Sequence, residues 1–412
     1  MDTNNETGLM QVIVTRSDSL IPIANAEVEI TDASTEEILA SETTDENGKT
    51  PLITLVTPPL AFSSFPSDNK PYAIYNVRVL ANFYDEQSVY DAQVFSGETA
   101  LQYVSLNPRQ ETGELNPPIV IGGNTLWEYY PPKIAEASIK PMNETGEIVL
   151  RQVVVPETIV VHDGVPSDST AKNYYVSYPD YIKNVACCEI YSTWPDATIR
   201  ANVLAIMSFT LNRVYTEWYR NKGYNFTITS STAYDHKWIY GQTISENISV
   251  IVDEMINSYI SKPNVKQPIL TQYCDGKRVS CPDWMSQWGS KYLGDDGFSA
   301  SEILRYYYGD EVYINVAPRV AGIPSSYPGY DLNIGSSGEA VTQIQEQLNR
   351  IAQNYPSIPK LTVDGIYGIA TKNAVSKFQS IFNLPASGIV DYPTWYKISQ
   401  IYVGVSKIAE NV

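Results

Sequence analysis

The sequence predicts a multidomain protein in which a β-sandwich, an α+β domain and a three-helix domain follow one another along the chain. Three observations lead to this prediction. At 412 residues the chain is too long for one compact domain. Apolar and polar residues alternate in short runs over the first 112 residues, as in half-buried strands. Apolar residues recur at helical spacing within residues 333–403.

The composition argues against several classes of protein. Hydrophobic residues make up 43% of the chain and charged residues 18%, so the domains can bury real cores. The 28 basic and 46 acidic residues give a net charge of −18, which argues against a nucleic-acid binder and against electrostatic docking on anionic lipid. No apolar run approaches the length of a membrane span, and the polar, acidic N-terminus shows no Sec signal peptide.

Residues 1–112 are predicted to form an acidic β-sandwich, as a pre- or pro-domain. The segments Pro22-Ile-Ala-Asn-Ala-Glu-Val28 and Thr44-Asp-Glu-Asn-Gly48 resemble transthyretin-like and carboxypeptidase-regulatory-like modules, which implies a seven-stranded sandwich. The first 113 residues hold 17 acidic and 5 basic side chains. A solvated surface explains this charge, and an acidic cover or targeting module is the alternative.

Residues 113–152 are predicted to be a Pro-rich linker that contains the activation cleavage region. Pro117, Pro118, Pro131, Pro132 and Pro141 interrupt it. Such a connection should be extended, exposed and easily cut by a protease.

Residues 153–328 are predicted to form the α+β domain. Trp194-Pro195-Asp196 marks the start of a helix that should be apolar most of the way round, reach about Tyr219 or Arg220, and stop before Gly223. A second helix should begin at the capping box formed by Ser299 and Glu302.

Residues 329–412 are predicted to form the three-helix domain. Another capping box, Ser336 with Glu339, should open its first helix, whose buried stripe is Val341, Ile344, Leu348 and Ile351. Helices over Thr371–Phe382 and Pro393–Ile398 should follow.

The motifs of this last domain resemble those of the peptidoglycan-binding domain type 1 family. They are Leu332-Asn-Ile-Gly335-Ser-Ser-Gly338, Asp364-Gly-Ile-Tyr367-Gly368, Phe378-Gln379 and Gly388-Ile-Val-Asp391 with Thr394-Trp395. The resemblance implies a module that docks on cell-wall polymer. Asp364 would offer hydrogen bonds to the polymer, and Tyr367 and Trp395 would offer stacking faces. The alternative for Trp395 is a core ring.

The α+β domain resembles the SpoIID/LytB family through three blocks in the same order. They are Tyr181-Ile-Lys-Asn-Val-Ala-Cys-Cys-Glu189 before Trp194-Pro195, Met285-Ser-Gln-Trp-Gly289, and Glu302-Ile-Leu-Arg-Tyr-Tyr-Tyr308. The chain departs from the family at Met207-Ser208 and Ser280–Trp284, and it lacks the His/Cys cluster of the zinc-binding members. The resemblance implies that Glu189 is the catalytic acid of a lytic transglycosylase.

A single carboxyl group suffices for that reaction. It protonates the glycosidic oxygen and then takes a proton from the C6 hydroxyl of the same sugar, so no second carboxylate is obligatory. Such an acid needs an apolar setting, which Cys187, Cys188, Ile190 and Trp194 would supply. The alternative is an ordinary glutamate in a salt bridge.

Asp235, His236, Tyr240 and Gln287 are further candidates for substrate binding in the cleft, with structural hydrogen bonding as the alternative. The adjacent Cys187 and Cys188 are poorly placed to pair with each other. Pairing with Cys274 or Cys281 stays open, and we favour reduced thiols. Neither a metal nor another cofactor is expected, because the ligand spacing forms no regular motif.

The order of the domains resembles the spore-cortex-lytic enzymes. That resemblance implies a zymogen of the spore cortex and coat region, made without a Sec signal, that acts on cortex peptidoglycan during germination. A subtilisin-like germination protease would activate it by cutting near Val149 and Leu150. Two rival functions remain: a non-catalytic wall-binding factor that enhances an amidase, and an N-acetylmuramoyl-L-alanine amidase, for which His162 and His236 are poor material.

Overall fold

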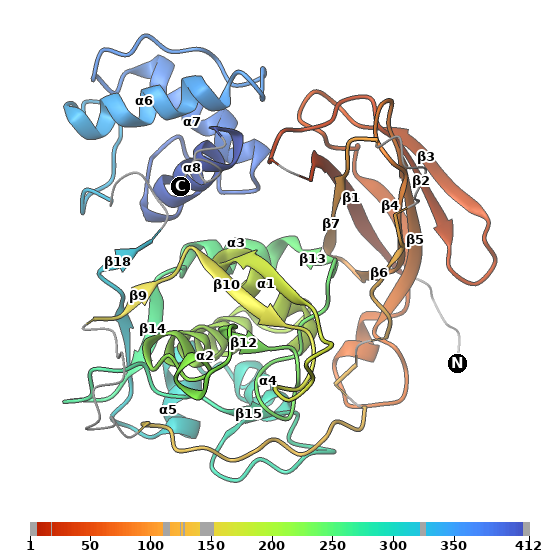
Figure 1. Ribbon diagram of the computed structural model, residues 1–412, viewed down its shortest axis with the longest axis vertical. Helices are drawn as coiled ribbons and strands as arrows, with labels where there is room; N and C mark the ends of the chain where they lie inside the picture. Colours follow the sequence, from red (N-terminus) through yellow and green to blue (C-terminus); the bar gives the residue numbers. More distant parts are fainter. Residues whose placement is uncertain are drawn as a thin grey trace.

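The computed structural model describes residues 6–17, 19–109, 116–123, 125–126, 128–140, 152–321 and 327–406. These residues form a sandwich of strands, a central domain of helices and short strands, and a small helical domain (Figure 1). The multidomain prediction is therefore confirmed. In the described part of the chain, no helix is long and apolar enough to cross a membrane.

Two sheets build the N-terminal domain, and one cluster of buried apolar side chains fills the space between them. Alternation dictates this arrangement: in β4 every second residue is buried and the others are exposed. One sheet has the order β4-β1-β7 and the other β3-β2-β5-β6-β8. The strands are β1 (Glu6–Arg16), β2 (Glu27–Asp32), β3 (Ile38–Thr43), β4 (Ile53–Thr57), β5 (Tyr72–Leu80), β6 (Gln87–Phe95), β7 (Thr99–Leu106) and β8 (Ile119–Val120), with the short helix η1 (Leu60–Ser63) after β4.

The sandwich is joined to the central domain by backbone hydrogen bonding. Strand β13 (Ile244–Ser245) of the central domain pairs antiparallel with β7, so that Ile244 lies opposite Leu101. The first sheet thus continues across the domain boundary. The sandwich is therefore not separate from the central domain, because the two share this sheet.

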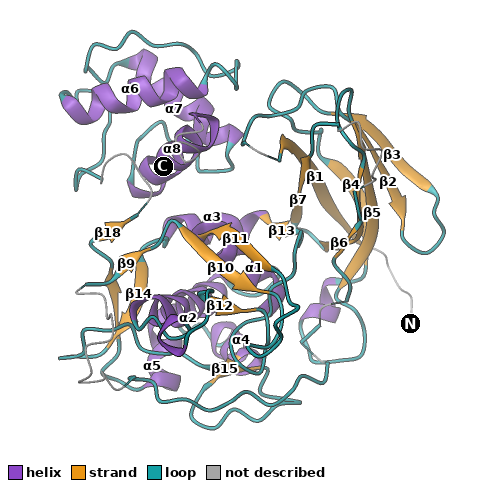
Figure 2. Cartoon of the chain, in the orientation of Figure 1, coloured by secondary structure: helices purple, strands orange, loops and turns teal. Residues whose placement is uncertain are grey.

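The central domain surrounds helix α2, as Figure 2 shows. Its remaining elements are β9 (Val154–Val155), β10 (Thr158–His162), β11 (Asn173–Ser177), α1 (Tyr178–Glu189), α2 (Asp196–Tyr215), η2 (Arg220–Lys222), β12 (Ile228–Thr229), α3 (Glu246–Glu254), β14 (Ser258–Ser261), β15 (Tyr273–Cys274), β16 (Met285–Ser286), α4 (Gln287–Asp295), α5 (Ala300–Tyr308), β17 (Tyr313–Val316) and β18 (Arg319–Val320).

Helix α2 starts after Pro195, as predicted, and is buried on nearly every side. It ends at Tyr215, earlier than predicted, because Glu217 adopts a φ of +47° and the N–H of Trp218 bonds to the Arg213 carbonyl. Helix α5 begins at the predicted capping box, in which Ser299 and Glu302 each accept from the other's backbone N–H.

Helix α1 was not predicted as a helix. Ser177 caps it through the N–H of Asp180, and Pro179 lies in its first turn. It ends at Glu189 because Ile190 is extended. The helix packs between α2 and α3, so its last residue emerges inside the domain.

The C-terminal domain has the three predicted helices, α6 (Glu339–Ile351), α7 (Ile369–Ile381) and α8 (Tyr392–Ser406). The predicted stripe of α6 is fully buried. The predicted capping box is wrong, because Gly338 is the N-cap and Ser336 instead accepts from the N–H of Asn333. Helix α8 is longer than predicted and extends past Ile398.

This domain rests on both others. The Lys49 ammonium of the sandwich donates to Asn383 Oδ1 at 2.9 Å, and Tyr355 donates to the Leu20 carbonyl at 2.8 Å. On the other side, Lys397 of α8 pairs with Asp253 of α3 at 3.3 Å.

Residues 128–140, which we name the crossing segment, lie within the predicted Pro-rich linker. They run extended along the central domain, at its lower edge in Figure 1. The N–H of Ile134 donates to the Ala233 carbonyl at 2.8 Å, and the N–H of Leu270 donates to the Ser138 carbonyl at 2.7 Å. Most residues of the segment are exposed, and the backbone hydrogen bonds of Ile134 and Ser138 hold it against the central domain.

Candidate active site

Glu189 is a buried carboxyl group at the end of α1, with 7% of its surface exposed. Its Oε1 accepts from the backbone N–H of Lys237 at 2.8 Å, and its Oε2 accepts from Nε2 of Gln287 at 3.0 Å. Three separate parts of the chain therefore meet at this one side chain. No salt bridge to Glu189 occurs within the described residues, so the alternative of an ordinary ion-paired glutamate is not what the structure shows.

Gln287 is the predicted site residue that contacts Glu189. It is the first residue of α4, whose N-cap Ser286 accepts from the N–H of Gly289. Its Nε2 also donates to the backbone carbonyl of Glu189 at 2.6 Å. Two segments that are 98 residues apart in the sequence thus meet directly.

Tyrosine rings surround the carboxyl group. Tyr273, at the start of β15, is 2% exposed, and its hydroxyl interacts with the side chain of Glu189. Burial raises the pKa of Tyr273 well above its usual range, as it does for Tyr181. Both hydroxyls therefore keep their protons and remain hydrogen-bond donors.

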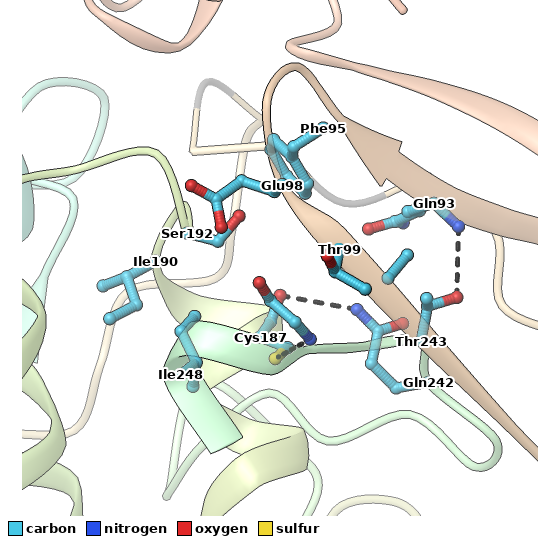
Figure 3. A pocket seen from close by; sticks show the side chains of 12 residues that line it. Gln93, Phe95, Glu98, Thr99, Cys187, Ile190, Ser192, Gln242, Thr243 and Ile248 are labelled. Carbon is cyan, nitrogen blue, oxygen red and sulfur yellow. Dashed lines mark hydrogen bonds between the residues drawn. The ribbon is translucent and has the colours of Figure 1, made fainter. Parts of the chain in front are cut away.

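Part of the expected apolar lining, Cys187, Ile190 and Trp194, faces the sandwich instead. Trp194 donates its indole N–H to the Ser63 carbonyl of the sandwich at 3.0 Å, so it faces the domain interface. Cys187 also faces that interface, where it lines a pocket with Glu98 and Thr99 (Figure 3). The immediate partners of Glu189 are instead an amide, a backbone N–H and phenol rings.

Asp235 is a structural residue in this fold. It is fully buried, and its Oδ1 pairs with Nε of Arg213 at 2.7 Å. Its Oδ2 accepts from the hydroxyl of Tyr219 at 2.6 Å and from the N–H and hydroxyl of Thr229 at 2.9 and 2.7 Å. Its acceptor sites are thus occupied, which corrects the expectation that it lines the substrate cleft.

His236 is also fully buried rather than lining an open cleft. Its Nδ1 lies 3.0 Å from the Tyr181 hydroxyl, and its ring stacks on Tyr273 with centroids 5.7 Å apart. Burial lowers the pKa of His236 well below its usual range, so the ring is neutral near pH 7. His236 thus contacts Tyr181 and Tyr273, the two tyrosines that interact with Glu189.

Tyr240 is the predicted site residue that reaches the surface. It is 49% exposed and stacks on Tyr174, with centroids 4.8 Å apart. It follows the Lys237 N–H that holds Glu189 by three residues, so one loop carries both. It stays a candidate for sugar stacking.

The crossing segment covers the neighbourhood of Glu189. The Lys237 ammonium donates to the Tyr130 hydroxyl at 3.2 Å, and Lys133 Nζ lies 4.3 Å from the centre of the Tyr273 ring. Further along, Glu136 forms a bidentate ion pair with Arg213 at 2.7 and 3.0 Å and also pairs with Lys140. Sequence reasoning missed these contacts, because the signal, alternating charges between prolines, is weak.

The favoured state of Cys187 and Cys188, reduced thiols, is confirmed. Cys274 and Cys281 form a disulfide with each other that closes the loop after β15, so neither pairs with Cys187 or Cys188. Cys187 and Cys188 are buried thiols of α1, and burial raises the pKa of both. Within the described ranges, no three His, Cys, Asp or Glu side chains gather closely enough to hold a metal ion.

Of the three predicted binding residues in the C-terminal domain, two are buried and one is exposed. Tyr367 and Trp395 are each 1% exposed and belong to the core, and Tyr367 donates to the Gly388 carbonyl. This burial corrects the expectation that their rings offer stacking faces. Asp364 is exposed, but its Oδ1 accepts from Gln345 and from the N–H of Ile366, both at 2.9 Å, and these bonds lower its pKa. The predicted cleavage residues Val149 and Leu150 lie outside the described residues.

Comparison with known proteins assigns the C-terminal domain. Residues 337–398 match the family model of a putative peptidoglycan binding domain. A stretch of 71 residues is 48% identical to the zinc D-Ala-D-Ala carboxypeptidase of Streptomyces albus G, over 17% of this chain and 26% of that protein. The chain thus spans about a quarter of the length of this curated relative. The chain therefore has a C-terminal domain that matches the putative peptidoglycan binding domain.

Solved structures resemble single parts of the chain. The SleB N-terminal domain matches 19% of this chain and 99% of its own length, with 27% identity and a TM-score of 0.17. The minor pilin GBS52 of Streptococcus agalactiae matches 27% of this chain and 49% of its own length, with 11% identity and a TM-score of 0.18.

Proposed function

We propose that the chain is the zymogen of a spore-cortex-lytic enzyme, similar to SleC, that cleaves peptidoglycan glycan strands as a lytic transglycosylase. The observation that carries the proposal is the environment of Glu189. It is a buried carboxyl group held by one N–H and one amide, without an ion-pair partner among the described residues. The peptidoglycan-binding domain supports the substrate class.

The arrangement fits a reaction with one acid. Glu189 would protonate the glycosidic oxygen as the bond from C1 breaks, and its carboxylate would then accept the proton of the C6 hydroxyl that attacks C1. Asp235, the acidic residue on the neighbouring loop, is fully paired with Arg213, Tyr219 and Thr229 and is unsuited to act as a second acid. The lysine and amide around Glu189 offer polar contacts for the sugar.

The zymogen proposal rests on the crossing segment. Its contacts to Lys237, Tyr273 and Arg213 cover the surface beside Glu189. A germination protease that cuts near Val149 and Leu150 would detach this segment from the catalytic chain. Activity would then require its release, because the segment is held by buried ion pairs as well as by the peptide bond.

A substitution of Glu189 by Gln tests the function. The change keeps the volume and removes the titratable proton, so release of anhydro-muramyl fragments from cortex should fall by roughly 10²–10⁴. Mass spectrometry of the digest identifies those fragments, and Glu254→Gln, a surface glutamate paired with Arg200, is the matched control.

The rival functions give different products. Free stem peptides would identify an amidase, and wall binding without any product would identify a non-catalytic enhancer. Activity of Glu189→Gln within threefold of the parent chain would contradict the proposed role of Glu189.

A further inference from the structure

Lys133 of the crossing segment has an unusual position. Its side chain is partly buried, and its ammonium lies over the Tyr273 ring at 4.3 Å while it donates to the Asp235 carbonyl at 2.9 Å. Burial lowers the pKa of Lys133, and the negative charge of Glu189 opposes this effect. The Lys133 ammonium thus lies over an aromatic face and interacts electrostatically with the candidate catalytic carboxyl group.

Tyr273 provides the aromatic face on which the Lys133 ammonium lies. Its ring is packed against the neutral His236, so the ring offers a π-face to a cation without a competing charge on the histidine. Its hydroxyl interacts with the side chain of Glu189, so the ring is held beside the candidate catalytic acid.

The transition state of glycosidic cleavage also carries a positive charge. The charge develops on C1 and the ring oxygen of the sugar as the bond to the leaving oxygen breaks. A preformed arrangement of carboxylate and aromatic face stabilises such a charge in a site shielded from water. The ammonium of Lys133 has the same sign and lies beside the same two groups.

We propose that the reacting sugar binds in the place that the Lys133 ammonium fills, so that Tyr273 is a further catalytic residue and Lys133 is the blocking side chain. This inference rests on the proposed function. Glu189 gives its proton to the leaving oxygen, the C6 oxygen bonds to C1, and the C6 hydroxyl proton returns to Glu189. Tyr273 exchanges no proton and stabilises the charged sugar through its ring.

A binding experiment tests the placement without turnover. The probe is 2-acetamido-1,2-dideoxynojirimycin, an imino sugar whose protonated ring nitrogen mimics the charged sugar, and neutral N-acetylglucosamine is the matched probe. Calorimetry on the uncut full chain should detect the imino sugar with Lys133→Ala but not with the parent chain. Lys222→Ala, which removes an ammonium 3.4 Å from the Trp218 ring, is the control and should behave like the parent.

The ring of Tyr273 is tested in the Lys133→Ala background. Tyr273→Phe keeps the ring and should retain imino-sugar binding, whereas Tyr273→Leu should weaken it about 30-fold, as expected for a desolvated cation–π contact. Tyr178→Leu is the control, because Tyr178 is also a buried tyrosine whose pKa is raised by burial.

The inference would be overturned if the Lys133→Ala chain did not bind the imino sugar. It would also be overturned if adding Tyr273→Leu to that chain left its affinity for the imino sugar unchanged. Wild-type cortex digests without anhydro-muramyl ends would overturn the proposed function instead. The two failures are therefore distinguishable, because the binding result does not depend on turnover.

Discussion

The side-chain amide of Gln287 holds Glu189 at two points: Nε2 donates to the carboxylate Oε2 at 3.0 Å and to the backbone carbonyl at 2.6 Å. This geometry fixes the direction of the carboxyl group relative to the end of α1. It also links α4 to α1 across the candidate active site.

Gln287→Leu should therefore lower the turnover of cortex glycan by about 10- to 100-fold. A hydrogen bond to a charged group contributes about 1.5–3 kcal/mol, and its loss leaves the Glu189 carbonyl unpaired. Gln242→Leu is the matched control, because Gln242 donates to the carbonyl of Cys187 on the same helix at 3.4 Å but faces the sandwich. Equal rates for the two variants would contradict a role of Gln287 in positioning Glu189.

Docking of the sandwich on the central domain should weaken as pH rises. Burial in the interface pocket of Figure 3, with a contribution from Glu246, raises the pKa of Glu98 from 4.5 to about 7. The docked state thus holds a proton that a separated sandwich would lose between pH 4.5 and 7. Stability from this group is present below pH 4.5 and lost as pH passes 7.

Glu98→Gln removes this effect. The variant should unfold at a higher temperature than the parent chain at pH 8 and at about the same temperature at pH 5. Glu46→Gln, on the exposed surface of the sandwich, is the control. The prediction would be refuted if the difference in unfolding temperature between the parent chain and Glu98→Gln were the same at pH 5 and pH 8.

The crossing segment should remain bound after the activating cut, and activity should follow its release. Glu136→Gln removes the bidentate ion pair with the buried Arg213, and breaking a buried pair costs about 3–5 kcal/mol. After cleavage near residues 147–155, size-exclusion chromatography should show faster loss of the N-terminal fragment from this variant than from the parent. The control is Glu128→Gln, whose partner Lys237 lies 3.9 Å away at a more exposed position. Immediate release of the fragment from the parent chain would contradict retention by these contacts.

Deletion of residues 329–412 should abolish sedimentation with insoluble peptidoglycan while lowering turnover of soluble glycan fragments less. The tethered domain raises the effective concentration of the enzyme at the wall without contacting Glu189. Lys397 of α8 pairs with Asp253 of the central domain, so the deletion also removes a contact that stabilises the central domain. Lys397→Met in the full chain removes this contact alone and measures its share of the lost turnover. This variant should still sediment with insoluble peptidoglycan. Equal losses on insoluble and soluble substrates would indicate a structural role for the domain.

The sequence by itself determined the elements whose pattern is local. The alternation of β4, the start of α2 after Pro195, the capping box at Ser299 and the buried stripe of α6 all depend on residues a few positions apart. Helix and strand propensity and the spacing of apolar residues depend on such near neighbours, so the sequence alone predicts these elements. The motifs of the C-terminal domain were sufficient to predict the peptidoglycan-binding domain that the family model matches.

Tertiary structure alone decided which side chains meet Glu189. Lys237 contacts Glu189 through its backbone N–H, which every residue except proline has, so the residue type does not predict this contact. Tyr273 and Lys133 come from segments that are 140 residues apart. It also decided that Asp235 serves Arg213, that Tyr367 and Trp395 lie in a core, and that residues 128–140 bind the central domain. A buried charge must find its partner in space, and the separation along the chain places no constraint on which partner that is.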